Sequence, residues 1–313
     1  MAATDWKSRV NPELRAAYRQ APNVTYGPLT MRAFRLLLRF LLPMPTLPKT
    51  IEARTVGVGD QSLRLLVPKA GPAAPAAMLW LHGGGRIMGT PSIVEHACIS
   101  VVERLGIVAA AASYRVAPEH PFPAALDDCA AAWQWLVDHA GELGIEASRM
   151  VIAGESAGGG LAAELCQRLR DEGLVTPAGQ ALVYPMLDDR TATRDDLTPM
   201  KHPVWNNASN RFGWSAYLGV PAGSSEVPAY AVAARCEDLT NLPPAWLTVG
   251  DLDLFLDEDL DYAERLREAG VPVTIDRVEG GFHGYFTIGP DTPPVRETWD
   301  SLERFLRSTL DVS

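Results

Sequence analysis

Short apolar runs alternate with helical patterns from about residue 76 to the end of this 313-residue chain. The alternation predicts an α/β fold in which a mostly parallel sheet carries helices on both faces. A Gly follows three of the helical patterns, and Gly readily takes the left-handed conformation that ends a helix. The expected strands are Ala77–Leu81, Ile107–Ser113, Met150–Ala153, Gln180–Tyr184, Ala245–Val249 and Val273–Val278, and the expected helices are Val94–Leu105, Ala124–Ala140, Ala157–Glu172, Glu258–Ala269 and Pro294–Leu310.

An antiparallel hairpin is expected ahead of these strands. Glu52–Val58 and Ser62–Val67 flank the turn dipeptide Gly59-Asp60, so they should pair at the edge of the sheet and bring it to about eight strands. Two further segments fall outside the alternation and are expected to form a cap over the sheet. The predicted division is 1–48 as N-terminal cap helices, 49–188 and 229–313 as the main α/β domain, and 189–228 as a second cap segment.

The composition and the cysteine spacing disfavour binding to nucleic acid and to metal ions. A net charge of −10 and a pI near 5.1 disfavour nucleic-acid binding, which rests largely on Lys and Arg neutralising phosphates. Apolar residues make up 47% of the chain and charged residues 21%, as in ordinary globular proteins. The cysteines are scattered singly, with no paired spacing and no His at metal-ligand spacing, so we expect buried free thiols and no metal site. They are Cys98, Cys129, Cys166 and Cys236.

The N-terminal sequence MAATDWKSRV has no apolar run behind its charged residues. It does not resemble a secretory signal, and a cytoplasmic protein is expected. The longest apolar stretch, Met31–Met44, is interrupted by three Arg residues, which rules out a spanning helix of about 20 apolar residues. We expect an amphipathic helix that packs on the body of the protein, with contact to lipid-like substrates as the alternative, and no stable membrane insertion.

The pentapeptide Gly154-Glu155-Ser156-Ala157-Gly158 stands between an expected strand and an expected helix. A strand-to-helix turn this tight needs residues without a Cβ on either side of the Ser, and it exposes the hydroxyl at the carboxyl end of the strand. The pattern therefore indicates a nucleophile elbow. Alone it is a weak motif, and a Gly-rich helix start that binds phosphate is the alternative.

The motif His82-Gly83-Gly84-Gly85 directly follows the strand that ends at Leu81. When a Ser attacks an ester, negative charge builds on the carbonyl oxygen, and backbone N–H groups free of side chains can converge on it. We expect an oxyanion hole formed by the N–H groups of Gly84, Gly85 and Ala157, with the first Gly of the motif a less favoured substitute. A flexible turn without a catalytic role is the alternative.

The remaining candidates follow the order Ser, acid, His on loops after late strands. His283 lies in a Gly-rich loop after the last strand and is expected to be the base, whereas the other five His are expected to be structural or on the surface. Several Asp residues crowd the loop before it. Asp257 is expected to cap the next helix, so the residues alone leave Asp251 and Asp253 open as the acid.

Together these motifs resemble the bacterial hormone-sensitive-lipase-like esterases, also called family IV lipolytic enzymes, of the α/β-hydrolase superfamily. The resemblance covers the chain from about residue 75 to the C-terminus. It implies the α/β-hydrolase fold, hydrolysis of short- to medium-chain acyl esters, and no cofactor. The matching motifs are HGGG at 82–85, YRVAPEHPFPAA at 114–125, GESAGG at 154–159, YPMLD at 184–188, DLFLDEDLDYAERLREAGVPV at 253–273 and the loop of His283.

The resemblance also implies Asp253 as the acid. The family's acid opens a D-P-L-x-D-E segment nine residues before a Tyr-Ala pair, and that pair is Tyr262-Ala263 here. Three positions depart from the family pattern. Glu155 stands where Asp or Thr is usual, Leu254 replaces a Pro, and Arg86 replaces an aromatic or apolar residue after HGGG.

Substrate-binding residues are expected in two places. Arg86 would lie near the acyl pocket and could favour substrates with a carboxylate, and the alternative is an Arg turned outward to a cap carboxylate such as Asp195 or Asp196. Aromatic residues of the second cap segment are expected to line the entrance, with packing inside the cap as the alternative. They are Trp205, Phe212, Trp214 and Tyr217.

The sequence thus predicts a serine carboxylesterase that acts on a small-molecule ester. His283 takes the proton of Ser156 as it attacks, Asp253 holds the imidazole, and an acyl-enzyme results. An amidase, peptidase or carbamate hydrolase on the same triad is the first alternative. A non-catalytic small-molecule receptor is the second, and it is disfavoured because all three triad positions are filled. Homodimer formation is left open.

Overall fold

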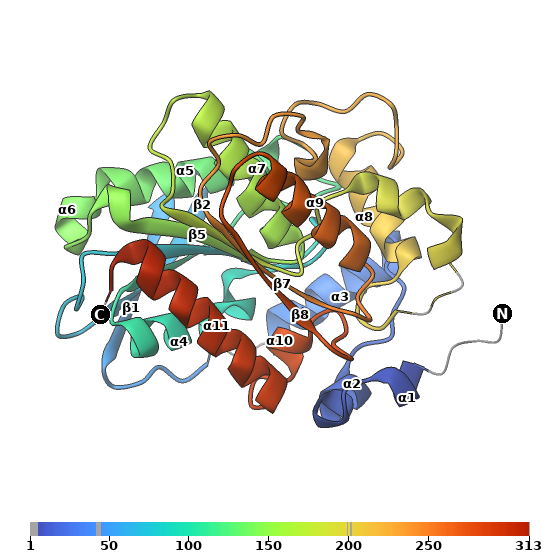
Figure 1. The fold of residues 1–313 in the computed structure, drawn as a ribbon, viewed down its shortest axis with the longest axis horizontal. Helices are drawn as coiled ribbons and strands as arrows, with labels where there is room; N and C mark the ends of the chain where they lie inside the picture. Colours follow the sequence, from blue (N-terminus) through green and yellow to red (C-terminus); the bar gives the residue numbers. More distant parts are fainter. Residues whose placement is uncertain (1–5, 42–44, 199, 201, 313) are drawn as a thin grey trace.

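The computed structural model describes residues 6–41, 45–198, 200 and 202–312. Its centre is an eight-stranded sheet in the order β1-β2-β4-β3-β5-β6-β7-β8 (Figure 1). β2 pairs antiparallel with β1 and β4, and all the other pairs are parallel, which confirms the predicted α/β architecture. The strands are β1 (Ile51–Val58), β2 (Gln61–Pro68), β3 (Ala77–Leu81), β4 (Val108–Ala112), β5 (Met150–Glu155), β6 (Gly179–Val183), β7 (Ala245–Gly250) and β8 (Val273–Val278).

The predicted hairpin is confirmed as β1 and β2, with β1 at one edge of the sheet and the turn between Val58 and Gln61. Every residue of β3, β4, β5, β6 and β7 is buried, because helices cover the middle of the sheet on both faces. The edge strand β1 is buried only at its two end residues, Ile51 and Val58, and is partly or fully exposed between them. The core therefore lies on both sides of the five central strands.

Helices α4 (Glu95–Leu105) and α11 (Pro293–Leu310) cover one face of the sheet, and α5 (Ala124–Asp138), α7 (Ala157–Asp171) and α9 (Leu256–Glu268) cover the other (Figure 1). Their boundaries agree with the prediction to within two residues. The shorter elements are α6 (Ala140–Leu143), α10 (Tyr285–Ile288), and the 3-10 turns Pro12–Leu14, Pro91–Ile93, Ala147–Arg149, Asp189–Thr193, Asp195–Leu197 and Ala233–Arg235.

Asp257 does not cap α9 as predicted. The helix begins at Leu256, two residues before the predicted start at Glu258, so Asp257 lies inside its first turn. Phe255 occupies the cap position without a side-chain hydrogen bond. The Asp257 carboxylate instead pairs with Arg194 at 2.5 Å on the surface. An acidic residue in the first turn still complements the helix dipole, which explains why a helix start was the correct expectation for this region.

The two segments outside the alternation contact each other. The first carries α1 (Trp6–Arg9), α2 (Arg15–Gln20) and α3 (Pro28–Leu41), and the second carries α8 (Asn207–Leu218). Val204 donates its N–H to the carbonyl of Pro22 at 2.8 Å, and Tyr26 donates its N–H to Oγ of Ser209 at 2.8 Å. The N-terminal segment is thereby attached to the second cap segment beside the sheet (Figure 1).

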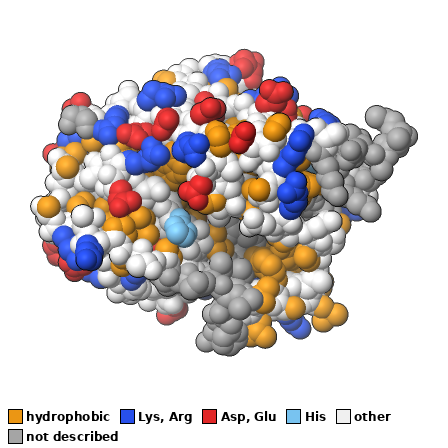
Figure 2. Space-filling model, turned by 90° about the horizontal axis from the view of Figure 1, so that it is seen from below, with side chains coloured by type: hydrophobic (Ala, Val, Ile, Leu, Met, Phe, Trp, Pro, Cys, Tyr) orange, Lys and Arg blue, Asp and Glu red, His pale blue; other side chains and the backbone are white. Residues whose placement is uncertain are grey.

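Helix α3 is amphipathic, as predicted, and residues 42–44 of the predicted stretch lie outside the described residues. Met31 is buried, while Leu29, Leu36 and Leu37 are exposed. Figure 2 shows charged side chains of both signs interspersed over one part of the face seen from below, and hydrophobic side chains gathered over another. None of the helices in the described ranges is long and apolar enough to cross a membrane.

All four cysteines are free thiols, as predicted. Three are buried and Cys236 is partly buried, so the expectation of burial holds for all but one. In the part of the chain that the structure describes, no group of three or more His, Cys, Asp and Glu side chains is arranged to hold a metal ion.

Candidate active site

Ser156 lies on the turn between β5 and α7 with φ 53° and ψ −119°. A residue with a side chain rarely adopts a positive φ, and such strain persists only where the surrounding structure enforces it. Packing of the turn supplies that constraint. A Cβ on Gly154 would overlap the backbone of Gly158, and a Cβ on Gly158 would overlap the backbone of Leu81 in β3. The turn has the geometry of the predicted nucleophile elbow.

Ser156, His283 and Asp253 form one hydrogen-bonded chain. Oγ of Ser156 lies 2.9 Å from Nε2 of His283, and Nδ1 of His283 lies 2.9 and 3.1 Å from the two carboxylate oxygens of Asp253. All three side chains are buried. The carboxylate also accepts the N–H of Phe255 at 3.0 Å, and the Phe255 ring meets the imidazole edge-on. This arrangement can move the hydroxyl proton to the imidazole while the carboxylate fixes the other ring nitrogen.

The loops that carry Asp253 and His283 follow the neighbouring strands β7 and β8. Leu252 donates its N–H to the carbonyl of Gly281 at 2.9 Å, and the Asp251 carboxylate accepts the N–H of Gly280 at 2.7 Å. Asp251 therefore binds the backbone of the histidine loop, whereas Asp253 binds the imidazole. Of the two acids that the residues alone left open, the structure places Asp253 next to His283.

The N–H groups of Gly84, Gly85 and Ala157 donate to no acceptor in the described ranges. Gly84 and Gly85 have φ of 125° and 61°, which favour glycine. The N–H of Gly83, in contrast, is directed to the carboxylate of Glu155. The three donors expected for the oxyanion hole thus have no protein acceptor in the described ranges, whereas the N–H of Gly83 faces the Glu155 carboxylate.

A cavity of about 280 Å³ lies over Ser156 and His283. Its surface is almost entirely apolar. The walls come from the HGGG loop, the loop after His283, the second cap segment and the N-terminal segment. The lining residues are Pro22, Tyr26, Phe34, Gly83, Gly84, Gly85, Met88, Ile93, Glu155, Ser156, Tyr184, Val204, Trp205, His283, Gly284, Thr287 and Ile288.

A family model described as the alpha/beta hydrolase fold matches residues 78–287. A solved esterase from the bacterial hormone-sensitive lipase family superposes with a TM-score of 0.79 at 26% identity, covering 96% of this chain and 99% of that one. The chain belongs to this esterase family. It is similar to Esterase LipI of Mycobacterium tuberculosis, at 31% identity over 85% of both chains, and to a solved Bacterial Heroin Esterase, at 33% identity and a TM-score of 0.88 over 97% of this chain and 98% of that one.

The aromatic residues expected at the entrance of this esterase take different places. Trp205 lines the cavity, with its ring against Gly85. Trp214 and Tyr217 are fully buried against the guanidinium of Arg86, and Phe212 is partly buried away from the cavity lining. Packing inside the cap, the alternative at the sequence level, describes Trp214 and Tyr217.

Arg86 neither lines the cavity nor turns outward. It is fully buried, and its guanidinium donates to both carboxylate oxygens of Glu164 in α7 at 2.9 and 2.7 Å. Both expectations for Arg86 were therefore wrong: it does not lie at the pocket, and its partner is Glu164 instead of Asp195 or Asp196. A buried guanidinium requires a buried carboxylate, and the trace of this pairing in the sequence is the single acid in the otherwise apolar helical stretch LAAELC.

The N-terminal wall of the cavity was not predicted residue by residue. Pro22, Tyr26 and Phe34 line it, although the sequence assigned residues 1–48 only to the cap in general. Tyr26 reaches the site because its ring packs against Phe34 and Trp205, with ring centroids 5.2 and 5.7 Å apart. Aromatic residues within an amphipathic segment were the available clue.

Glu155, the family departure next to the nucleophile, is a buried carboxylate on the cavity wall. It accepts hydrogen bonds from the hydroxyl of Thr287 at 2.6 Å and of Tyr184 at 3.4 Å. Burial raises the pKa of Glu155, although these donors oppose the shift. The carboxylate therefore links the elbow to the loop after His283.

Proposed function

We propose that this esterase hydrolyses short- to medium-chain acyl esters through an acyl-enzyme intermediate. Ser156 is the nucleophile, His283 is the general base and then the general acid, and Asp253 orients the imidazole. The observation that carries the proposal is the 2.9 Å contact between Oγ of Ser156 and Nε2 of His283 on the wall of an apolar cavity. A small-molecule ester is the partner that fits such a cavity.

In the first half of the reaction, Oγ of Ser156 attacks the ester carbonyl carbon as Nε2 of His283 takes its proton. The carbonyl electron pair moves to the oxygen, where the free N–H groups of Gly84, Gly85 and Ala157 stabilise the charge. The C–O bond to the alcohol breaks, and the imidazolium gives its proton to the leaving oxygen. In the second half, water attacks the acyl carbon, its proton goes to His283, and Ser156 regains its proton as the acid leaves.

Two features support a neutral, modest-sized substrate. The cavity volume of about 280 Å³ is near the lower end of the roughly 300–1,000 Å³ typical of small-molecule sites. Its lining is apolar, and the buried Arg86 is paired elsewhere, so it offers no cation to a substrate carboxylate. Acyl groups that fill such a space by apolar contact alone gain affinity from each buried CH₂.

The test is Ser156→Ala combined with active-site labelling. We expect the variant to fold with an unchanged far-UV circular dichroism spectrum and to lose about 10⁴–10⁶-fold in kcat on p-nitrophenyl butyrate, as nucleophile removal does in other triad hydrolases. An organophosphate fluoride should add to Ser156, as read by peptide mass spectrometry, and His283→Ala should abolish the adduct. Full activity in Ser156→Ala, or an adduct on another residue, would overturn the proposal.

A further inference from the structure

Arg86 follows directly after the last Gly of the HGGG motif and has a φ of 63°. Its guanidinium donates to both Glu164 oxygens, and Nη2 also donates to the carbonyl of Met186 at 3.3 Å. Both charged side chains are 0% exposed. One ion pair inside the core therefore joins three parts of the site: the loop with the proposed oxyanion donors, the helix α7 that directly follows Ser156, and the segment after β6.

The same pair binds the cap helix α8. The guanidinium carbon lies 4.5 Å from the ring centre of Trp214 and 4.3 Å from that of Tyr217. The Tyr217 hydroxyl donates to Glu164 at 3.3 Å. Cation–π contacts of this kind are strongest where water is excluded, as it is here. The position of α8 and the position of Arg86 are consequently coupled.

The path from Arg86 to the reacting atoms is short. Met186, whose carbonyl accepts from the guanidinium, donates its own N–H to the carbonyl of Ser156 at 2.8 Å. On α7, a Cβ on Gly160 would overlap the backbone of Met186 and stand 2.5 Å from the guanidinium. The missing side chain of Gly160 thus makes the space that the guanidinium occupies. Gly85 is the residue before Arg86. The guanidinium therefore anchors the loop next to the N–H of Gly85.

The Arg86 guanidinium stays protonated although it is buried. Burial alone would lower the pKa of Arg86, but the adjacent Glu164 raises it above its ordinary value. An apolar pair of similar volume would generally serve stability as well as a buried ion pair does. A two-pronged guanidinium–carboxylate contact adds a defined geometry instead. The Arg86–Glu164 pair is therefore better explained by the fixed position that it gives to the loop of Arg86 than by a gain in stability.

We propose that Arg86 is a positioning residue of this esterase: paired with Glu164, it fixes the N–H groups of Gly84 and Gly85 relative to Ser156 and couples them to α8. The inference rests on the proposed function, because these N–H groups must form the oxyanion hole. Arg86 does not line the cavity. Its loss should therefore weaken stabilisation of the transition state and leave ground-state binding almost unchanged.

The experiment compares Arg86→Met and Arg86→Lys with the wild type on p-nitrophenyl butyrate. It also measures the inhibition constant of a trifluoromethyl ketone, which forms a tetrahedral adduct with the active Ser. Arg86→Met should lower kcat by about 10²-fold, comparable to losing one oxyanion donor, while KM changes by less than about threefold. The inhibition constant should rise in proportion to the fall in kcat/KM. Arg86→Lys should recover part of the kcat and part of the affinity for the ketone, because Lys keeps the charge but cannot make the bidentate contact.

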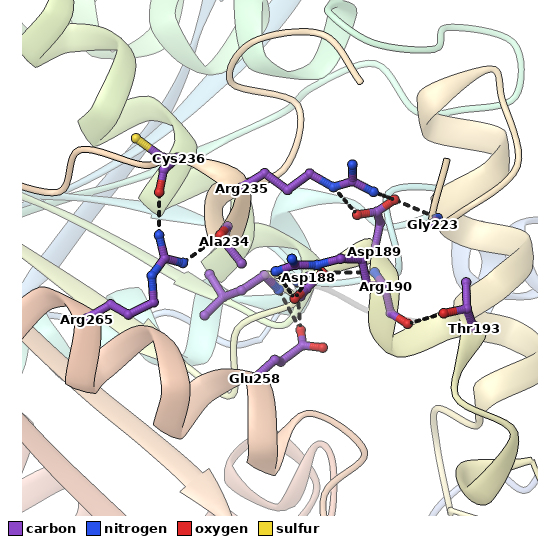
Figure 3. A network of polar contacts seen from close by, with 11 residues as sticks. Asp188, Asp189, Arg190, Thr193, Gly223, Ala234, Arg235, Cys236, Glu258 and Arg265 are labelled. Atoms are coloured by element: carbon purple, nitrogen blue, oxygen red, sulfur yellow. Dashed lines mark hydrogen bonds and ion pairs between the residues drawn. The ribbon is translucent and has the colours of Figure 1, made fainter. Parts of the chain in front are cut away.

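A matched control exists in a second ion pair that holds the cap segment. Arg235 donates to both oxygens of the buried Asp189 at 2.8 Å, and Asp189 also accepts the N–H of Gly223 at 2.7 Å (Figure 3). Neither residue lines the cavity. Arg235→Met should lower the melting temperature and leave kcat and the inhibition constant unchanged.

If Arg86→Met is too unstable to assay, the double variant Arg86→Met/Glu164→Leu replaces it, because this variant removes both buried charges. This double variant should recover thermal stability and still show the weakened ketone binding. The inference is overturned if the folded Arg86 variants have the same kcat, and the same inhibition constant for the ketone, as Arg235→Met. If the wild type itself gives no Ser156 adduct and no inhibition by the ketone, the proposed function fails, and the role of Arg86 fails with it.

Discussion

The indole of Trp205 occupies the space that a Cβ on Gly85 would need, since such an atom would overlap Cη2 and Cζ2 of the ring. Gly213 in α8 approaches from the same segment, and a Cβ there would stand 2.7 Å from the carbonyl oxygen of Gly85. The second cap segment thus packs on the backbone of the HGGG loop with no side chain of the loop between them. Movement of Trp205 or of α8, the parts of the segment that contact Gly85, is therefore transmitted directly to the proposed oxyanion donors. Asp189 and Gly223, at the ends of the segment, do not contact Gly85.

Gly85→Ala should lower kcat/KM on p-nitrophenyl butyrate by about 10–10²-fold, because the added methyl displaces either Trp205 or the loop. Trp205→Ala should restore part of this loss when combined with Gly85→Ala, since it removes the overlapping ring. Gly59→Ala is the control, with a similar φ of 56° and nothing within 4 Å of its added Cβ. Purely additive losses in the double variant would show that the contact does not position the loop.

The acid assignment is tested by three Asp→Asn variants. Asp253→Asn should lower kcat by up to about 10⁴-fold, because an amide cannot hold the same imidazole tautomer and charge. Asp251→Asn should cost less than about tenfold, since the side-chain oxygen of Asn can still accept the N–H of Gly280. Asp257→Asn should also have a small effect, because Asp257 lies on the surface. A larger loss at Asp251 than at Asp253 would contradict the assignment.

Acyl-chain preference follows from the cavity wall. A p-nitrophenyl ester series from acetate to palmitate should give the highest kcat/KM at short to medium chains. Phe34→Ala, which enlarges the cavity from the N-terminal side, should shift the optimum to longer chains, whereas Phe212→Ala should not, because Phe212 does not line the cavity. Rates on long-chain triglyceride emulsions that equal those on short esters would contradict this preference.

The sheet and the triad loops were predictable because their signals are local. Apolar runs define the strands, the glycines around Ser156 define the turn, and parallel strands end at the same edge, so Ser156 and His283 come together. The edge hairpin was equally clear from its turn dipeptide. Each of these elements depends on a few consecutive residues.

The side-chain contacts of the two cap segments and the partner of Arg86 were not predictable, because they depend on contacts between distant segments. Arg86 and Glu164 are 78 positions apart, and the lone acid in an apolar helical stretch indicates a buried partner for Glu164 without identifying Arg86 as that partner. The aromatic residues of the second cap segment divide between cavity and core according to how α8 packs. Trp205 precedes the helix and reaches the cavity, whereas Trp214 and Tyr217 point to Arg86. The order of residues in the sequence alone does not show which of these aromatic side chains line the cavity and which pack in the core.

The HGGG loop should also make stability depend on pH, through His82. Its ring is buried, stacks on Tyr114 with centroids 4.1 Å apart, and has Nδ1 2.8 Å from the carbonyl of Gly83. Burial lowers the pKa of His82 to about 4, although the Gly83 carbonyl opposes the shift. An unfolded chain has a His pKa of about 6.5. Between these two values the unfolded state binds the proton and the folded state does not.

Acidification from pH 8 to pH 5 should therefore remove about 2 kcal/mol from the contribution of His82 to the free energy of unfolding. Buried carboxyl groups such as Glu155 and Glu164, whose pKa values burial raises, change stability in the opposite direction, so the His82 contribution is the difference between the wild type and a variant without this ring. Urea unfolding of the wild type and of His82→Gln at both pH values measures it, because the variant lacks the titrating group and should lose about 2 kcal/mol less over this range. His120→Gln is the control, since His120 is exposed and its replacement should leave the wild-type dependence unchanged. Equal losses in the wild type and His82→Gln would show that His82 is protonated as easily in the folded chain as in the unfolded one.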